Sequence, residues 1–135
     1  MNNELTLFKG NQNNNIYCSI VAKDNEEKKK LFNALENCDL LLNDCVGQEI
    51  AMKDLYIEAY ENEDETSGEV KTKYRTIIFD VDGQTYATGS YGIYNILNKI
   101  VAIYGLPSTW AEPVKVEVIK KPTKDGKQSL SLKLV

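Results

Sequence analysis

Apolar residues alternate, or recur every three to four positions, along most of the chain, and this pattern predicts its elements. Residues 16–22 are rich in β-branched and aromatic side chains, which indicates a strand. A helix is predicted over residues 26–37, because Asp24 and Glu27 have the spacing of a capping box and the acidic residues come first. Residues 38–46 are expected to form a short helical turn or a loop that buries leucines, and the polar residues 1–15 a loose arm.

One long strand is predicted over residues 47–60. Ile50 and Met52 alternate with polar residues, and Leu55, Ile57 and Ala59 alternate in the opposite phase. An inserted residue that forms a β-bulge changes the phase in this way and bends the strand. We therefore expect a bulge near residues 53–54, followed by an acidic loop.

A hairpin is predicted over residues 70–88, because Asp82-Gly83 is a strong signal for a two-residue turn. That turn sets Phe79 opposite Tyr86. Alternation along the strands then assigns one face to Arg75, Ile77, Phe79 and Tyr86, and the other to Tyr74, Thr76, Ile78 and Ala87.

An amphipathic helix is predicted over residues 91–104, where apolar residues recur at helical spacing. Ser90 is placed to cap its start and Gly105 to close its end. Alternating valines over residues 114–118 and alternating leucines over residues 130–134 predict two further strands.

The elements after residue 47 therefore follow the order strand, strand, strand, helix, strand, strand. This is the order of an OB-fold, a five-stranded Greek-key barrel that often binds oligonucleotides. We expect a mainly β protein with helices, forming one compact domain. Residues 47–135 form the barrel in this interpretation, and residues 1–46 contribute an N-terminal arm and a strand–helix elaboration packed on it.

Composition excludes several classes of protein. The chain has 135 residues, 42% hydrophobic and 27% charged, which is typical of a single soluble domain. It has no histidine, so serine-protease triads, cysteine–histidine pairs and histidine-ligated zinc are excluded. The three cysteines form no CxxC pair and are expected to be free thiols in a reducing compartment. With no apolar stretch of transmembrane length and no secretory signal, we expect a cytoplasmic protein without a membrane partner.

Charge is divided unevenly between the halves of the chain. Residues 1–70 contain 6 Lys and Arg against 15 Asp and Glu, whereas residues 71–135 contain 10 against 5. A basic second half favours an anionic partner, because a phosphate responds to the local patch and not to the overall net charge.

The segment IIFDVDGQT at residues 77–85 is similar to the signature of haloacid dehalogenase-like phosphatases, whose first aspartate is a nucleophile. Those enzymes need further carboxylates and a long α/β chain after this strand. Only Glu112, Glu117 and Asp125 follow it here. The hairpin turn explains the motif more simply, and we predict a protein with no enzymatic activity, no metal site and no cofactor.

Most tyrosines and the single tryptophan lie between residues 56 and 110, among basic residues of the same strands. Aromatic rings stack on bases while basic side chains follow the phosphates, so this mixture is typical of binding to single-stranded nucleic acid. Phe79, Tyr94 and Tyr104 are expected to be core residues instead.

Several short motifs occur in a fixed order over residues 75–118. They are Arg75-Thr76 before a hydrophobic strand, the Asp82-Gly83 turn, Ser90 and Gly92 at a helix start, and Gly105-Leu106-Pro107 with Trp110 before a V-x-V strand. In this order they resemble the single-stranded DNA-binding proteins of phages and prophages of Gram-positive bacteria. The resemblance implies an OB-fold and a non-enzymatic protein that coats single strands during phage DNA replication or recombination.

The resulting hypothesis is sequence-tolerant binding of single-stranded DNA in the cytoplasm of a bacterial host. The predicted phosphate contacts are Lys71, Lys73, Arg75, Lys115, Lys120 and Lys121, and the predicted stacking residues are Tyr74, Tyr86, Tyr91 and Trp110. Phage replication or recombination proteins and a second copy of the chain, as a homodimer, are further candidate partners. Because the hairpin has two faces, either Tyr74 or Tyr86 belongs to the core.

An alternative function belongs to another class. The acidic first half is also what a small phage-encoded inhibitor would use to bind a host enzyme as a DNA mimic. Quenching of the Trp110 fluorescence by poly(dT), reversed by salt, favours the DNA-binding hypothesis. A fluorescence that does not respond to nucleic acid favours the inhibitor.

Overall fold

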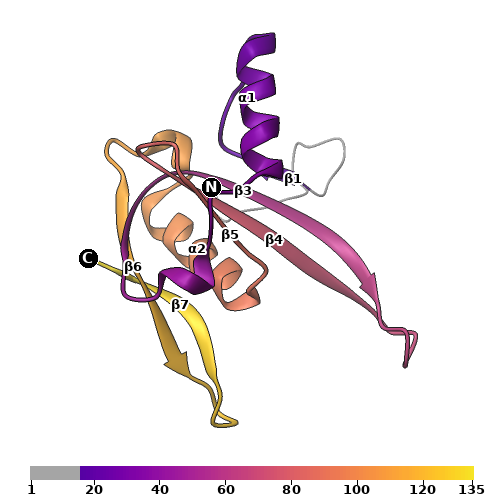
Figure 1. Cartoon of the computed structure of the whole chain (residues 1–135). Coiled ribbons are helices and arrows are strands. Elements are labelled where there is room, and N and C mark those ends of the chain that lie inside the picture. Colours follow the sequence, from indigo (N-terminus) through magenta and orange to yellow (C-terminus); the bar gives the residue numbers. More distant parts are fainter. Residues whose placement is uncertain (1–15) are drawn as a thin grey trace.

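The computed structural model describes residues 16–135, and the expected loose arm at residues 1–15 lies outside this range. One curled sheet contains the strands β1 (Ile16–Cys18), β2 (Leu40–Leu41), β3 (Glu49–Glu63), β4 (Val70–Asp80), β5 (Thr85–Thr88), β6 (Val114–Pro122) and β7 (Gln128–Leu134). The strand order is β2-β5-β4-β3-β6-β7, with β1 added to β3. Two helices accompany the sheet, α1 (Asn25–Glu36) and α2 (Tyr91–Tyr104), together with the short 3-10 turns η1 (Leu42–Cys45) and η2 (Pro107–Thr109) (Figure 1).

The prediction of one long bent strand is confirmed by β3. Its pairing with β4 shifts between Met52 and Asp54, where the phase of the apolar residues changes in the sequence. Before the bulge β3 pairs with β6, and after it with β1 over Tyr56–Glu58. The bulge thus lets one strand belong to two parts of the curled sheet.

Both helices have the predicted caps. The Asp24 carboxylate accepts a hydrogen bond from the backbone N–H of Glu27 at 2.8 Å, and the Ser90 hydroxyl accepts one from the N–H of Ile93. Gly105 follows α2 with φ +90°, and its N–H donates to the Val101 carbonyl. The local signals in the sequence therefore place both helices correctly.

Within residues 16–135 the sheet has seven strands, where the sequence predicted five in a barrel and a sixth before it. The additional strand is β2, a two-residue strand parallel to β5, in a segment expected to be a helical turn or a loop. Asp39 holds it there: its carboxylate accepts hydrogen bonds from the backbone N–H and the hydroxyl of Thr85. Such a strand depends on a distant partner and leaves almost no local pattern.

The predicted register of the β4–β5 hairpin is wrong by one residue. Tyr86 lies opposite Ile78, and Phe79 lies opposite Thr85. The loop is longer than a two-residue turn, because the Asp80 N–H donates to the Gln84 carbonyl and Gly83 adopts φ +83°. A slip of one residue exchanges the two faces, so Tyr86 shares a face with Tyr74 and not with Arg75.

The sheet buries both of its faces. The inner face and α2 enclose the larger core, which includes Ile57, Ile78, Tyr86, Leu97 and Val116. On the outer face Tyr56, Ile77 and Phe79 form a smaller core under β1 and the half-buried face of α1. No residue of α1 is fully buried, and the helix stands out from the rest of the molecule (Figure 1).

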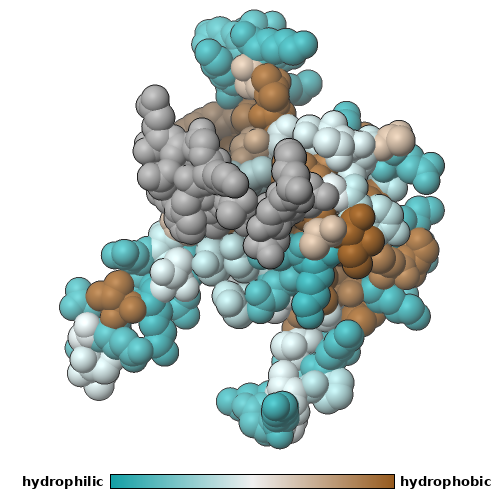
Figure 2. All heavy atoms as spheres, turned by 180° about the vertical axis from the view of Figure 1, so that it is seen from behind, coloured by the Kyte–Doolittle hydropathy of each residue, from teal (hydrophilic) through white to brown (hydrophobic). Residues whose placement is uncertain are grey.

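Two hairpins extend beyond the packed body. The outer parts of β3 and β4 form one arm, and the outer parts of β6 and β7 form the other, with α2 between them at their base (Figure 1). Both arms are predominantly hydrophilic when viewed from behind (Figure 2). Within the described residues, no helix is long and apolar enough to span a membrane.

Candidate nucleic-acid interface

Three tyrosines form an aromatic cluster where β4 meets the start of α2. Tyr74 stacks on Tyr94 with ring centroids 3.9 Å apart and an interplanar angle of 7°. Tyr91 lies tilted against both, at 5.9 Å from Tyr74 and 6.0 Å from Tyr94. With 60% of its surface exposed, Tyr91 offers a ring to a ligand while its neighbours support it.

Sequence reasoning selected Tyr74 and Tyr91 and assigned Tyr94 to the core. Tyr94 is only half-buried and completes the cluster. Tyr94 follows Tyr91 by three residues, and side chains at this spacing are neighbours on one face of a helix. This spacing was the signal in the sequence that the two rings lie together. Burial, and to a lesser extent the neighbouring Tyr94, raises the pKa of Tyr74.

Lys71 and Lys73 lie on the β3–β4 arm, in the same strand as Tyr74 but nearer the tip of the arm. They pair in register with Asn62 and Tyr60, and all four side chains are exposed. Alternation along β4 places these lysines on the outer face and Tyr74 on the inner face. Tyr60, 46% exposed beside Lys73, is a further aromatic candidate that the sequence reasoning did not select.

Arg75 contacts the helix α1. Its Nη2 donates to the backbone carbonyl of Leu35 at 2.8 Å and approaches the Cys38 sulfur at 3.9 Å. The last carbonyl groups of a helix have no partner within it, and a cation there is favourable. Arg75 thus anchors α1 to the sheet, and the guanidinium nitrogen that makes this bond is not free for a phosphate.

Tyr86 lies in the inner core with 5% of its surface exposed. Its hydroxyl donates to the Asp80 carboxylate at 2.9 Å, and the other oxygen of that carboxylate accepts from the N–H groups of Asp82 and Gln84. Burial, with the hydrogen bond to Asp80, raises the pKa of Tyr86 to about 12. The ring is inaccessible to a base in this structure, because the hairpin register turns it inward.

Trp110 and Lys115 line a different site, a groove of about 780 Å³ beside the end of α2. The indole N–H donates to the Gly105 carbonyl at 2.8 Å, which holds the ring across the helix end. Glu49 and Glu112 line the same groove and repel phosphates. A helix of this length separates Trp110 from Tyr91 by about 20 Å, so the two sites are distinct.

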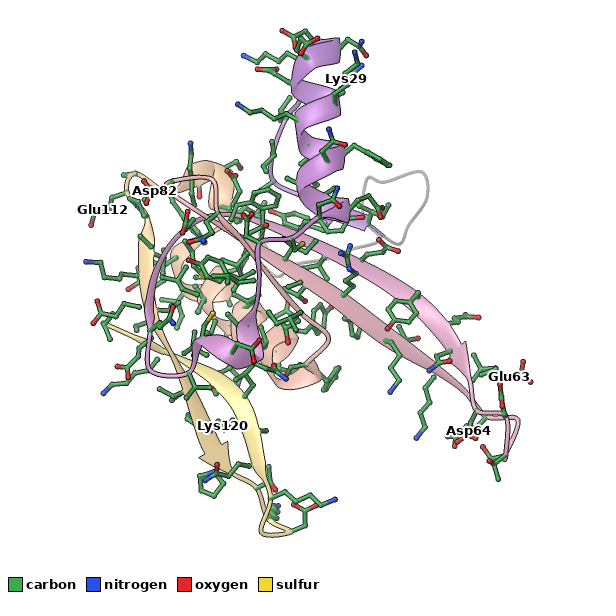
Figure 3. The ribbon with its side chains drawn as sticks, in the orientation of Figure 1. Lys29, Glu63, Asp64, Asp82, Glu112 and Lys120 are labelled. Atoms are coloured by element: carbon green, nitrogen blue, oxygen red, sulfur yellow. The ribbon has the colours of Figure 1, made fainter. Side chains whose placement is uncertain are left out.

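Lys120 and Lys121 lie near the end of β6, and Lys120 is labelled on the second arm in Figure 3. Lys124 and Lys127 flank the turn beyond them, and the sequence reasoning did not select either. A lysine on each side of the Asp125-Gly126 turn was the available signal. Within residues 16–135 none of the lysines on either arm forms an ion pair.

The described residues contain no group of three or more cysteine or carboxylate side chains that could hold a metal ion. An aromatic cluster with one exposed ring, between two arms whose lysines form no ion pair within residues 16–135, is typical of proteins that bind single-stranded nucleic acid.

Comparison with known proteins gives the family. The family model described as "Phage Single-stranded DNA-binding protein" matches residues 10–135, and the chain belongs to this family. A relative named "Single-stranded DNA-binding protein", from Bacillus phage GA-1, is 28% identical over 115 residues. The match covers 82% of this chain and 66% of the relative, so the chain spans about two thirds of its length. No solved structure matched the chain.

Proposed function

We propose that this protein binds single-stranded DNA, without strong sequence preference, through the tyrosine cluster and the lysines of the two arms. The observation that carries the proposal is the exposed ring of Tyr91, supported by Tyr74 and Tyr94. A base can stack on this ring, and every base has a π-face, so such contacts do not select a sequence. Family membership and the name of the GA-1 relative support the same function.

The curled sheet supports an OB-like interpretation. Strands β3 to β7 correspond to the five barrel strands, with residues 47–135 as the barrel and β1, α1 and β2 added to it. The order β5-β4-β3-β6-β7 and the position of α2 between β5 and β6 agree with this assignment. In a closed barrel β5 would pair with β7. In the described residues β5 pairs with β2 instead, and α2 packs against β7.

The corresponding biological role is to cover single strands exposed during phage DNA replication or recombination, in the cytoplasm of the bacterial host. Phage replication proteins are then candidate partners. The DNA-mimic alternative has less support, because the exposed arms carry lysines that form no ion pair in the described part of the chain, and the family is one of DNA-binding proteins.

Fluorescence anisotropy of labelled oligonucleotides tests the proposal directly. We expect oligo(dT) and a mixed-sequence single strand to bind with similar affinity, and a duplex of the same length to bind much more weakly. Equal affinity for duplex and single strand, or no response to any nucleic acid, contradicts the proposal.

Salt dependence should report the phosphate contacts. Each phosphate neutralised on a single strand contributes about −0.7 to the slope of log K against log salt concentration. We expect the double variant Lys71→Ala/Lys73→Ala to reduce the magnitude of this slope by roughly 1.4, if both lysines contact phosphates. Lys29→Ala, which removes an exposed lysine from α1, should leave the slope unchanged. Equal slopes for both variants would exclude the arm from the interface.

No phosphatase activity is expected from the DVDG motif. The Asp80 carboxylate already accepts hydrogen bonds from the turn and from Tyr86, which explains its presence without chemistry. Assays with p-nitrophenyl phosphate and magnesium should give the same background rate for the parent protein and for Asp80→Asn. A turnover that is lost in Asp80→Asn would contradict this expectation.

A further inference from the structure

The outer part of the β3–β4 arm is a two-stranded ribbon over residues 60–63 and 70–73, and it packs against nothing else in residues 16–135. Tyr60–Glu63 and all of residues 70–73 are exposed, and Val70 has 54% of its surface in contact with solvent. An isolated ribbon of two strands is only marginally stable in water. The outer part of this arm therefore lacks the third strand or packed layer that ribbons of this kind need.

The outer edge of β4 is open over the same residues. Its neighbour β5 pairs only from Thr76 to Phe79, so residues 70–73 have no strand beside them among the described residues. The Asp80 N–H donates toward β5, to the Gln84 carbonyl. Because main-chain groups alternate along a strand, Val70 and Thr72 direct their N–H and C=O groups to this same open side.

We propose that a second copy of the chain occupies this edge, with the two β4 strands antiparallel about a two-fold axis at Lys71. Val70 of each copy then lies opposite the partner's Thr72, and each of these pairs exchanges two backbone hydrogen bonds. The result is a four-stranded ribbon. This uses only the open residues of β4 and leaves the pairing of β3 with β4 intact.

The direction of β4 determines where the two bodies lie in the proposed dimer. Strand β4 runs from the tip of the arm to the body, and the arm projects clear of the rest of the molecule (Figure 1). Antiparallel pairing therefore directs the two bodies to opposite ends of the shared ribbon. The edge of β3 is a poorer choice, because β1 already pairs along it up to Glu58 and its outer part carries Glu61 and Glu63.

Charge favours this register. On the outer face each Glu69 lies opposite the partner's Lys73, an attractive pair, while Lys71 lies opposite the partner's Lys71. The repulsion between the two central lysines is relieved when a phosphate binds between them. Pairing and DNA binding then strengthen each other by linkage, a step that rests on the proposed function.

A cysteine cross-link measures the register. Facing residues of a non-hydrogen-bonded antiparallel pair have Cα atoms about 4.5 Å apart, within the range of a disulfide. Lys71→Cys should therefore form a covalent dimer under mild oxidation. The matched variant Lys73→Cys lies about 14 Å from its own counterpart in this register and should cross-link no more than the parent, which retains Cys18, Cys38 and Cys45. Equal cross-linking of both variants, or of neither, overturns the proposal.

A second variant blocks pairing at the edge of β4 and leaves the side chains of the predicted DNA contacts unchanged. Thr72→Pro deletes an N–H that points away from β3, so the hairpin keeps its own hydrogen bonds. Sedimentation velocity should show dimers that persist in the control Thr72→Val and dissociate in Thr72→Pro. An unchanged dimer in Thr72→Pro, or a monomer in the parent at every concentration with and without oligo(dT), overturns the proposal.

The same measurements separate this inference from the proposed function. Dimers and Lys71→Cys cross-links that form while no nucleic acid binds would leave the edge pairing standing and remove the proposed function. DNA binding without dimers or selective cross-links would leave the proposed function standing and overturn the edge pairing.

Discussion

Replacing Tyr91 by alanine should lower the affinity for oligo(dT) by roughly 5-fold to 150-fold, because base–aromatic stacking contributes about 1–3 kcal/mol per base. The ring is exposed at the first position of α2, supported by Tyr74 and Tyr94. Its removal leaves no cavity, so the melting temperature should change little. Anisotropy titrations and thermal melting on the same sample measure the two quantities.

Two further variants make this result specific. Tyr91→Phe keeps the π-face and should bind nearly as well as the parent. Phe32→Ala removes another exposed ring, 62% accessible on α1, and should not affect binding. If Tyr91→Ala binds as tightly as the parent, or if Phe32→Ala is equally weakened, the tyrosine cluster is not the stacking site.

Tyr86→Ala should have the largest effect on stability. Truncating a buried aromatic side chain costs about 3–5 kcal/mol, a large share of the about 5–15 kcal/mol that stabilises a small domain. The substitution also removes the hydroxyl that donates to the buried Asp80 carboxylate. We expect a large drop in melting temperature, measured by circular dichroism, and DNA binding that is retained at temperatures where the variant is folded. A stable variant with weakened binding would show that the ring contacts DNA after all.

Tyr86→Phe separates the ring from its hydroxyl. It keeps most of the packing and should be much more stable than Tyr86→Ala.

Stability should also depend on pH through Tyr86, whose pKa is raised to about 12 in the folded state. The stabilisation from its protonated hydroxyl is fully present below the pKa of an unfolded tyrosine and is lost as pH rises through about 12. Urea unfolding should show this loss in the parent and less of it in Tyr86→Phe; identical profiles would contradict the assignment.

The sequence was sufficient wherever a structural feature depends on neighbours along the chain. Asp24 and Ser90 cap the two helices because a side-chain oxygen reaches an N–H three residues later. The change of phase at residues 53–54 marked the bulge in β3, because alternation is a property of the strand itself. The sequence also predicted Tyr74 and Tyr91 as stacking residues, and the structure places their rings 5.9 Å apart, while their contact with DNA stays a prediction.

Other features depended on contacts between distant segments, and only the tertiary structure decided them. The three-residue loop at Asp80 moved the hairpin register by one residue, which turned Tyr86 into the core. Arg75 reads as a phosphate contact in the sequence, but the packing of α1 on the outer face brings the Leu35 carbonyl to its guanidinium. The two outcomes have different causes. A one-residue shift reverses the faces of a strand and buries Tyr86. Arg75 is engaged because α1 packs over the outer face, and local sequence carries little information about which layer will cover a face.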